Sequence, residues 1–183
     1  AVEAATSEMM RTCDACGCKP SMPMYNHAFA ALSRHAPPEA VLSWTARMRH
    51  AGVPLDLIAC NMQLKAHAAM GDLRAATRLL TGMLRAADAP APPPGTAAAA
   101  AQLPPPDEVS FNTVIAALAH ARKPGEAEAL LIQMLDLGLH RPSTVTFTSV
   151  ITGFALSSQP ERATKWLRRM LDARIMPDAR AFN

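Results

Sequence analysis

Apolar residues recur at the spacing of an α-helix along most of the chain, in short stripes separated by polar, Pro or Gly residues. Within each stripe the positions follow i, i+3 or i+4, and i+7, which places them on one face of a helix. The stripes come in pairs, so the pattern predicts helical hairpins. The first stripes are Tyr25/Phe29/Leu32, Cys60/Leu64/His67, Phe111/Ile115/Leu118 and Phe147/Ile151/Phe154, and the second are Val41/Trp44/Met48, Ala76/Leu80/Met83, Ala127/Leu131/Met134 and Ala163/Leu167/Met170.

Pro and Gly mark the turn between the two helices of each pair. Pro is tolerated in the first turn of a helix, and the nearby Glu39, Glu126 and Glu161 would lie at the favourable end of the helix dipole. We therefore expect a second helix to begin after each break. The breaks are Ala36-Pro37-Pro38, Gly71-Asp72, Lys123-Pro124-Gly125 and Gln159-Pro160.

The hairpins repeat with a fixed internal spacing. A Met follows 22 residues after each of Asn26, Asn61, Asn112 and Thr148, and Gly or Pro with a small polar residue then closes the unit. The predicted repeats are 22–56, 57–107, 108–143 and 144–178, with 1–21 as the second half of a preceding repeat and 179–183 as the start of a further one. The second repeat carries a Pro/Ala-rich insertion at 88–106, which we expect to be a tolerated loop without a core of its own.

A hairpin of two such helices cannot bury its apolar face alone, so consecutive hairpins must stack into an α-solenoid. Composition agrees, because only 4% of the 183 residues are aromatic and Ala is abundant, which disfavours a β-sandwich. No apolar run reaches the roughly 18 to 20 residues of a membrane span. The sequence begins without Met and breaks off within a repeat, so we expect it to be part of a longer chain.

The repeats resemble those of the pentatricopeptide repeat family. The opening of its unit is matched by Val109-Ser110-Phe111-Asn112-Thr113-Val114-Ile115 and by Val145-Thr146-Phe147-Thr148-Ser149-Val150-Ile151, and its closing Pro-Asp by Met176-Pro177-Asp178. The chain departs from the pattern at Leu55 and Arg174, which replace the usual Pro and Gly. The resemblance implies a right-handed all-α solenoid.

The resemblance also implies candidate RNA-contacting residues. In this family the fifth and last residues of a repeat bind one RNA base, and the second residue packs against the base faces. The implied base-binding pairs are Asn26 with Asp56, Asn61 with Asp107, Asn112 with Ser143, and Thr148 with Asp178, and Asn183 begins a further pair. The implied base-packing residues are Pro23, Ile58, Val109, Val145 and Arg180.

By the family's code these pairs imply U, U, C or U, and G, read 5′ to 3′. The implied partner is single-stranded RNA in a chloroplast or mitochondrion, and the implied role is stabilisation, processing, splicing or translation of a transcript. An alternative reading stays open, because Asn and Asp at helix starts are also ordinary N-caps. In that case the chain is an architectural subunit of an organellar ribosome or another large complex and binds ribosomal RNA or protein.

No catalytic, metal or cofactor site is expected. Cys13-x-x-Cys16-x-Cys18 has the spacing of half a zinc site, but no second pair completes it, and the repeat register places these residues in the core and in a turn. No His is followed by x-Glu, as a zinc deaminase would require. We expect a protein without enzymatic activity or small-molecule substrate. The basic residues of the second helices would form an outer face.

Overall fold

The computed structural model describes residues 25, 37–90, 93, 96, 101–138 and 142–177. This part of the chain contains seven α-helices and no β-strand, which confirms the predicted all-α class. Within the same ranges, none of the helices combines the length and apolar character that crossing a bilayer requires. The helices are α3 (Pro38–His50), α4 (Leu57–Ala69), α5 (Leu73–Asp88), α7 (Glu108–His120), α8 (Pro124–Leu137), α9 (Thr144–Leu156) and α10 (Pro160–Asp172).

The helices begin at the predicted breaks. Pro38, Pro124 and Pro160 lie in the first turn of α3, α8 and α10, where the missing N–H removes no helical hydrogen bond. Asp72 caps α5 by accepting a hydrogen bond from the backbone N–H of Ala75 at 3.0 Å. The predicted second helices are therefore confirmed at their starting points.

The turn between paired helices has the same backbone at three places. Gly71, Arg122 and Ser158 each follow the end of a first helix by two residues and have φ of 73°, 56° and 56°. The next backbone N–H returns to the last helical turn, as from Lys123 to the Leu118 carbonyl at 2.9 Å. This is the Schellman arrangement, which glycine adopts without steric cost and other residues do not.

The predicted stripes form the core between the helices. The recurring methionines Met48, Met83, Met134 and Met170 are all fully buried, as are most residues of the first-helix stripes. His67, at the end of one stripe, is half-buried with a side-chain exposure of 20%. The core is therefore continuous along the chain, as the stacking of hairpins requires.

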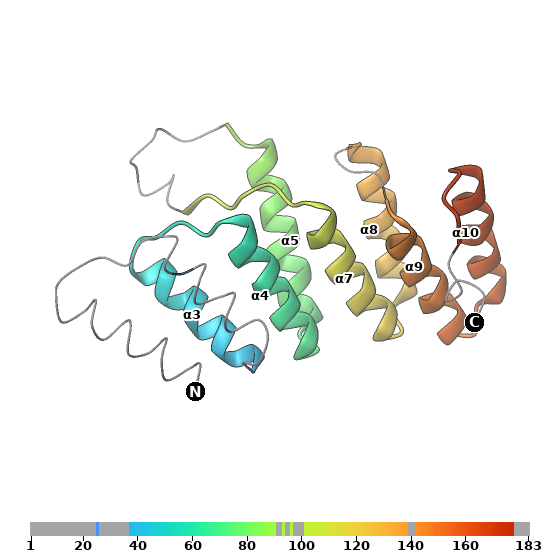
Figure 1. Cartoon of the computed structure of the whole chain (residues 1–183), viewed down its shortest axis with the longest axis horizontal. Coiled ribbons are helices and arrows are strands. Elements are labelled where there is room, and N and C mark those ends of the chain that lie inside the picture. Colours follow the sequence, from blue (N-terminus) through green and yellow to red (C-terminus); the bar gives the residue numbers. More distant parts are fainter. Residues whose placement is uncertain are drawn as a thin grey trace.

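The helices follow one another in pairs along the long axis of the molecule and form two layers, one of first helices and one of second helices (Figure 1). In the first layer α4 contacts α7, and α7 contacts α9. In the second layer α5 and α8 each contact the first helix of their own pair and that of the following pair. This alternation produces the predicted α-solenoid.

A glycine permits the close approach of two first helices. A Cβ atom added at Gly153 of α9 would lie 2.9 Å from the Cβ and 3.0 Å from the Cα of Ala119 in α7. Both residues are buried. The small side chains Gly153 and Ala119 therefore set the separation between α7 and α9.

The insertion rejoins the solenoid before α7 begins. Leu103 packs against the core and approaches Gly82 of α5, where an added Cβ would lie 3.1 Å from its Cδ1 atom. Pro106 is buried. The segment 88–106, expected to be a loop without a core of its own, therefore joins the core of the solenoid at its end. Because Leu103 lies only a few residues before the cap of α7, it can reach the space beside α5.

Candidate nucleic-acid interface

The last residues of three predicted repeats lie at the starts of first helices. Asp56, Asp107 and Ser143 are the N-cap residues of α4, α7 and α9. Asp56 accepts a hydrogen bond from the backbone N–H of Ala59 at 2.8 Å. These residues therefore do act as caps, which was the alternative reading of the sequence, and they lie in a row along the first layer.

Asp107 is held by several donors. Its carboxylate accepts hydrogen bonds from the backbone N–H and the hydroxyl of Ser110, both at 2.8 Å. Asn61 Nδ2 of the preceding first helix donates to both carboxylate oxygens at 3.2 and 3.3 Å. Burial alone would raise the pKa of Asp107, but these hydrogen bonds outweigh it and lower the pKa. The group is therefore a fixed anion at neutral pH.

The structure thus brings the predicted pair Asn61 and Asp107 into direct contact, although 46 residues separate them in the chain. Ser110 completes the contact, because its hydroxyl lies 2.6 Å from Asn61 Oδ1 and donates to it. The insertion therefore leaves the pair intact.

The predicted pair Asn112 and Ser143 is linked through a third residue. Thr146 Oγ1 donates to Asn112 Oδ1 at 2.5 Å and accepts a hydrogen bond from the backbone N–H of Ser143 at 3.1 Å. Asn112 Nδ2 donates to Glu108 Oε1 on its own helix at 3.2 Å. Each Asn therefore has its carbonyl oxygen facing a hydroxyl of the next repeat and its amide nitrogen facing a carboxylate.

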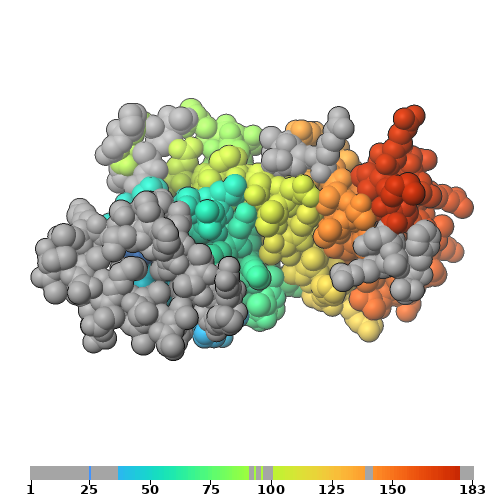
Figure 2. All heavy atoms as spheres, viewed as in Figure 1, coloured from blue at the N-terminus to red at the C-terminus, as the bar shows by residue number. Residues whose placement is uncertain are grey.

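Exposed aliphatic side chains accompany these amides. Ile58, Val109 and Val145, the predicted base-packing residues of three repeats, are 54%, 56% and 58% exposed. They occupy the same position in α4, α7 and α9, whose surfaces follow one another across the molecule in teal, yellow and orange (Figure 2). The first layer therefore presents a regular series of aliphatic side chains, each three residues before the polar residue.

The remaining predicted residues are either buried or outside the part of the chain that the structure describes. Thr148 is buried, with 6% of its surface exposed. Several predicted residues fall outside the described residues: Cys13, Cys16, Cys18, Pro23, Asn26, Asp178, Arg180 and Asn183. Cys60 lies in the core, and burial raises the pKa of its thiol to about 11, so it is a packing residue with a protonated thiol.

Sequence reasoning missed Ser110 and Thr146, which the structure places between the predicted pairs. Both occupy the third position of a first helix, and both are fully buried. The signal available in the sequence was the hydroxyl three residues after each N-cap, which is a capping-box pattern. That pattern predicts the cap but not the bond to the preceding repeat.

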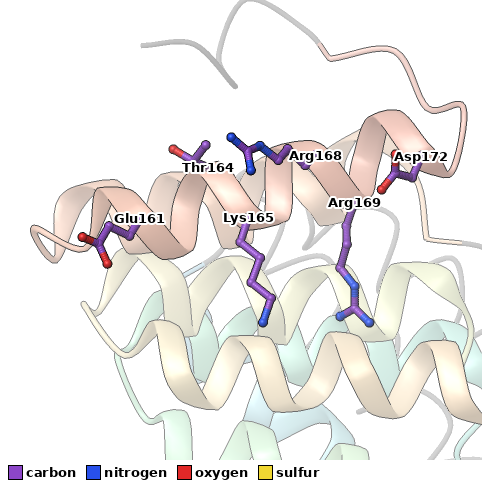
Figure 3. A pocket seen from close by; sticks show the side chains of 6 residues that line it. All are labelled: Glu161, Thr164, Lys165, Arg168, Arg169 and Asp172. Carbon is purple, nitrogen blue, oxygen red and sulfur yellow. The ribbon is translucent and has the colours of Figure 1, made fainter.

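Most of the described arginines lie on helices of the second layer. A shallow cavity of about 480 Å³ on α10 is lined by Lys165, Arg168 and Arg169 together with Glu161, Thr164 and Asp172 (Figure 3). A larger cavity of about 900 Å³ extends from α5 to the start of α8, and its lining includes Arg74, Arg78, Arg85 and Lys123. Basic residues of α5 and α10 thus line concave regions of the second layer.

Comparisons with family models match two overlapping segments in the second half of the chain. A family model described as the PPR repeat family matches residues 106–155, and one described as the PPR repeat matches residues 145–175. No curated protein matches the sequence.

Several solved structures share the fold. The pentatricopeptide repeat protein PPR10 from maize has a TM-score of 0.77 at 18% identity, over 96% of this chain and 23% of that chain. PPR10 in complex with an 18-nt psaJ RNA element has a TM-score of 0.72 at 19% identity, with the same coverage. The PPR domain of Arabidopsis thaliana protein-only RNase P 1, in complex with tRNA, has a TM-score of 0.75 at 11% identity, over 97% of this chain and 85% of that chain.

Because the sequence identities to these structures are low, the similarity shows the fold alone. The chain spans about a quarter of the length of PPR10. The family models match the segments that contain α7, α8, α9 and α10. The family models therefore show that residues 106–175 consist of repeats of the pentatricopeptide repeat family, and the described helices before them continue the same helical fold.

Proposed function

We propose that the chain binds single-stranded RNA on the face formed by α4, α7 and α9, with one base at each repeat. The observation that carries this proposal is the repeated arrangement on these helices. An exposed aliphatic residue lies three positions before a side-chain amide that hydrogen bonds to neighbouring residues hold in place, as Val109 lies before Asn112. Aliphatic surface suits the face of an unstacked base, and an amide suits its Watson–Crick edge.

The proposed reading is U at Asn26/Asp56, U at Asn61/Asp107, C or U at Asn112/Ser143 and G at Thr148/Asp178. Asn61 supports it chemically, because an amide has two N–H groups and two lone pairs, of which Asp107 and Ser110 occupy one each. One donor and one acceptor are left among the described contacts. A pyrimidine offers the complementary acceptor and donor side by side on its Watson–Crick edge.

We place this binding in a chloroplast or mitochondrion and assign it a non-catalytic role in stabilising, processing, splicing or translating a transcript. Bound bases would be unavailable for pairing or nuclease attack. The chain spans about a quarter of the length of PPR10, so it offers few base contacts and should bind RNA weakly. The base-stacking contribution is about 1 to 3 kcal/mol per base.

The test is fluorescence anisotropy with short single-stranded RNAs that contain the U-U-C-G core, varied one base at a time. We expect the preference at the fourth position to move from G toward U in the Thr148→Asn variant. Thr113→Val is a matched control, because the Thr113 hydroxyl donates to the Val109 carbonyl of its own helix. Equal binding of all RNAs by the unmodified chain and by Thr148→Asn would refute the base assignment.

A second candidate function rests on the cavity between α5 and α8. Arg74, Arg78 and Arg85 line it at spacings that place them on one face of α5, and none makes an ion pair with the other described residues. In this role the outer face docks onto ribosomal RNA or an acidic protein within a large assembly. Replacing the three arginines with Gln would then release the protein from the assembly, whereas transcript binding would persist.

A further inference from the structure

Asn61 and Asn112, two of the predicted base-reading amides, are each connected to the following repeat by one buried hydroxyl. We use the name hydroxyl bridges for the hydrogen bonds from Ser110 Oγ to Asn61 Oδ1, at 2.6 Å, and from Thr146 Oγ1 to Asn112 Oδ1, at 2.5 Å. Both donors are fully buried at the third position of a first helix. Because the same hydrogen bond recurs at two successive interfaces, it is a repeated feature of the packing between repeats.

The direction of each bridge is fixed by its surroundings. The backbone N–H of the N-cap residue donates to the hydroxyl oxygen, from Asp107 to Ser110 at 3.2 Å and from Ser143 to Thr146 at 3.1 Å. A hydroxyl that accepts from a backbone N–H has its single proton left to donate. The Ser110 proton is shared between Asn61 Oδ1 at 2.6 Å and Asp107 Oδ1 at 2.8 Å, and the amide oxygen is the nearer acceptor. The Thr146 proton goes to Asn112 Oδ1. The bridge therefore requires the amide oxygen on this side.

A carboxylate on the other side of each amide imposes the same orientation. Asn61 Nδ2 faces Asp107, and Asn112 Nδ2 faces Glu108. Carboxylate oxygens only accept hydrogen bonds, so a flipped amide would place its oxygen against them and its nitrogen against the donating hydroxyl. Both contacts would be lost at once, and each amide is thereby held in one of its two orientations.

Orientation matters for choosing between the two pyrimidines. Uracil presents an N3–H donor beside a carbonyl acceptor, whereas cytosine presents an N3 acceptor beside an amino donor. An amide that flips freely can satisfy either edge, whereas a fixed amide satisfies only one. We propose, on the basis of the function proposed above, that Ser110 and Thr146 are positioning residues whose hydroxyl bridges let Asn61 and Asn112 distinguish uracil from cytosine. The third position, given above as C or U, then prefers one of the two.

The bridges belong to particular interfaces and not to the fold as such. In α4 the equivalent third position is Ala59, which is buried and has no hydroxyl. Asp56 nevertheless caps α4 through the Ala59 backbone N–H. Capping therefore does not need the hydroxyl, so removing it can test the bridge without removing the cap.

The experiment measures the ratio of affinities for U and C at each position of the U-U-C-G core, using the 183-residue chain. Ser110→Ala is expected to lower the ratio at the second position at least about fivefold, the lower end of what one bidentate base contact discriminates, and to leave the third position unchanged. Thr146→Val is expected to affect the third position and not the second. The hydroxyl-retaining variants Ser110→Thr and Thr146→Ser should preserve the ratios.

Matched controls remove hydroxyls elsewhere on the same helices. Ser149→Ala and Thr113→Val delete groups that donate only to the Val145 and Val109 carbonyls of their own helices. They should change no ratio. A uniform loss of affinity for U and C in Ser110→Ala, with an unchanged ratio, would overturn the proposal and leave Ser110 as a capping residue alone.

A measurement without RNA separates this inference from the proposed function. If the unmodified chain binds none of the RNAs, the proposed function fails. NMR of the side-chain amide protons of Asn61 and Asn112 then tests whether the two amides are held in one orientation. Hydrogen exchange of these protons that is slow in the unmodified chain and at least about tenfold faster in the alanine or valine variant supports fixed amides, because a lost hydrogen bond of about 1.4 kcal/mol corresponds to that factor. Equal exchange rates in the unmodified chain and in the variant would overturn the inference that the amides are fixed.

Discussion

The two helix layers are connected along the solenoid in different ways. In the first layer α7 and α9 approach closely at Gly153 and Ala119, and short polar side chains such as Ser110 connect neighbouring helices. In the second layer α8 and α10 are connected by long side chains. Glu128 accepts a hydrogen bond from Trp166 Nε1 at 2.7 Å and forms an ion pair with Arg162.

The difference follows from how closely the helices lie. Close helices leave room only for small groups, which have few rotamers and stay where the backbone places them. More distant helices need long side chains to make contact, and their charged ends remain near solvent. The first layer therefore offers polar groups at fixed positions, as base recognition requires, whereas the second layer offers long cationic side chains suited to less specific electrostatic contact.

The largest expected effect comes from removing Trp166, which joins α10 of the second layer to α8 and α9. Trp166 is 1% exposed and packs against Phe147 with ring centroids 6.1 Å apart. Trp166→Ala should lower the free energy of unfolding by about 3 to 5 kcal/mol because it leaves a large cavity. Urea denaturation followed by circular dichroism measures the change. Trp166→Phe, which keeps a ring but loses the bond to Glu128, should cost only about 1 kcal/mol.

The next effect tests close packing in the first layer. Gly153→Ala forces a Cβ atom against the Ala119 backbone, so α7 and α9 must separate, and we expect a loss of about 2 kcal/mol. Gly125→Ala in α8 is the matched control, because no atom lies within 4 Å of the added Cβ. Its stability should be unchanged or rise by about 0.5 kcal/mol. Equal effects of the two substitutions would show that the layers do not differ in packing.

The layers themselves could be predicted from the sequence, but the contacts within them could not. A stripe with a recurring Met such as Met134 reports which face of a helix is buried, so the hairpins and the core followed from spacing alone. The hydroxyl bridge from Thr146 to Asn112 depends on the distance between α9 and α7, and that distance is set by residues elsewhere, Gly153 and Ala119. The position of Leu103 beside α5 similarly depends on the path of the inserted chain.

A smaller effect is expected at the turn that connects the two layers. Arg122 has φ of 56° at the position that Gly71 occupies in another repeat, so its side chain crowds the backbone there. Arg122→Gly should raise the free energy of unfolding by about 1 kcal/mol by relieving this strain. Arg122→Ala removes the same charge but keeps the Cβ atom, so it should give no gain. A gain in both variants would assign the effect to charge instead of backbone conformation.

The smallest expected effect concerns acid stability and compares the caps of the two layers. Because hydrogen bonds lower the pKa of Asp107 in the folded chain, its carboxylate contributes stability above the unfolded pKa of about 3.9. That contribution is lost as the pH falls through the folded pKa. Asp107→Asn keeps a capping side chain but does not titrate. Its stability should therefore fall less steeply than that of the unmodified chain below about pH 4, as measured by urea denaturation across this range.

The matched control is Asp72→Asn at the start of α5 in the second layer. Asp72 caps its helix through the Ala75 backbone N–H, and its other neighbour is His67, with 4.0 Å between His67 Nδ1 and Asp72 Oδ2. Asp107 instead binds Asn61 of the preceding helix as well as its own cap. If acid stability depends on this contact between repeats, only Asp107→Asn changes the slope. The same change in Asp72→Asn would mean that a capping carboxylate suffices and that the polar contacts of the first layer add no acid sensitivity of their own.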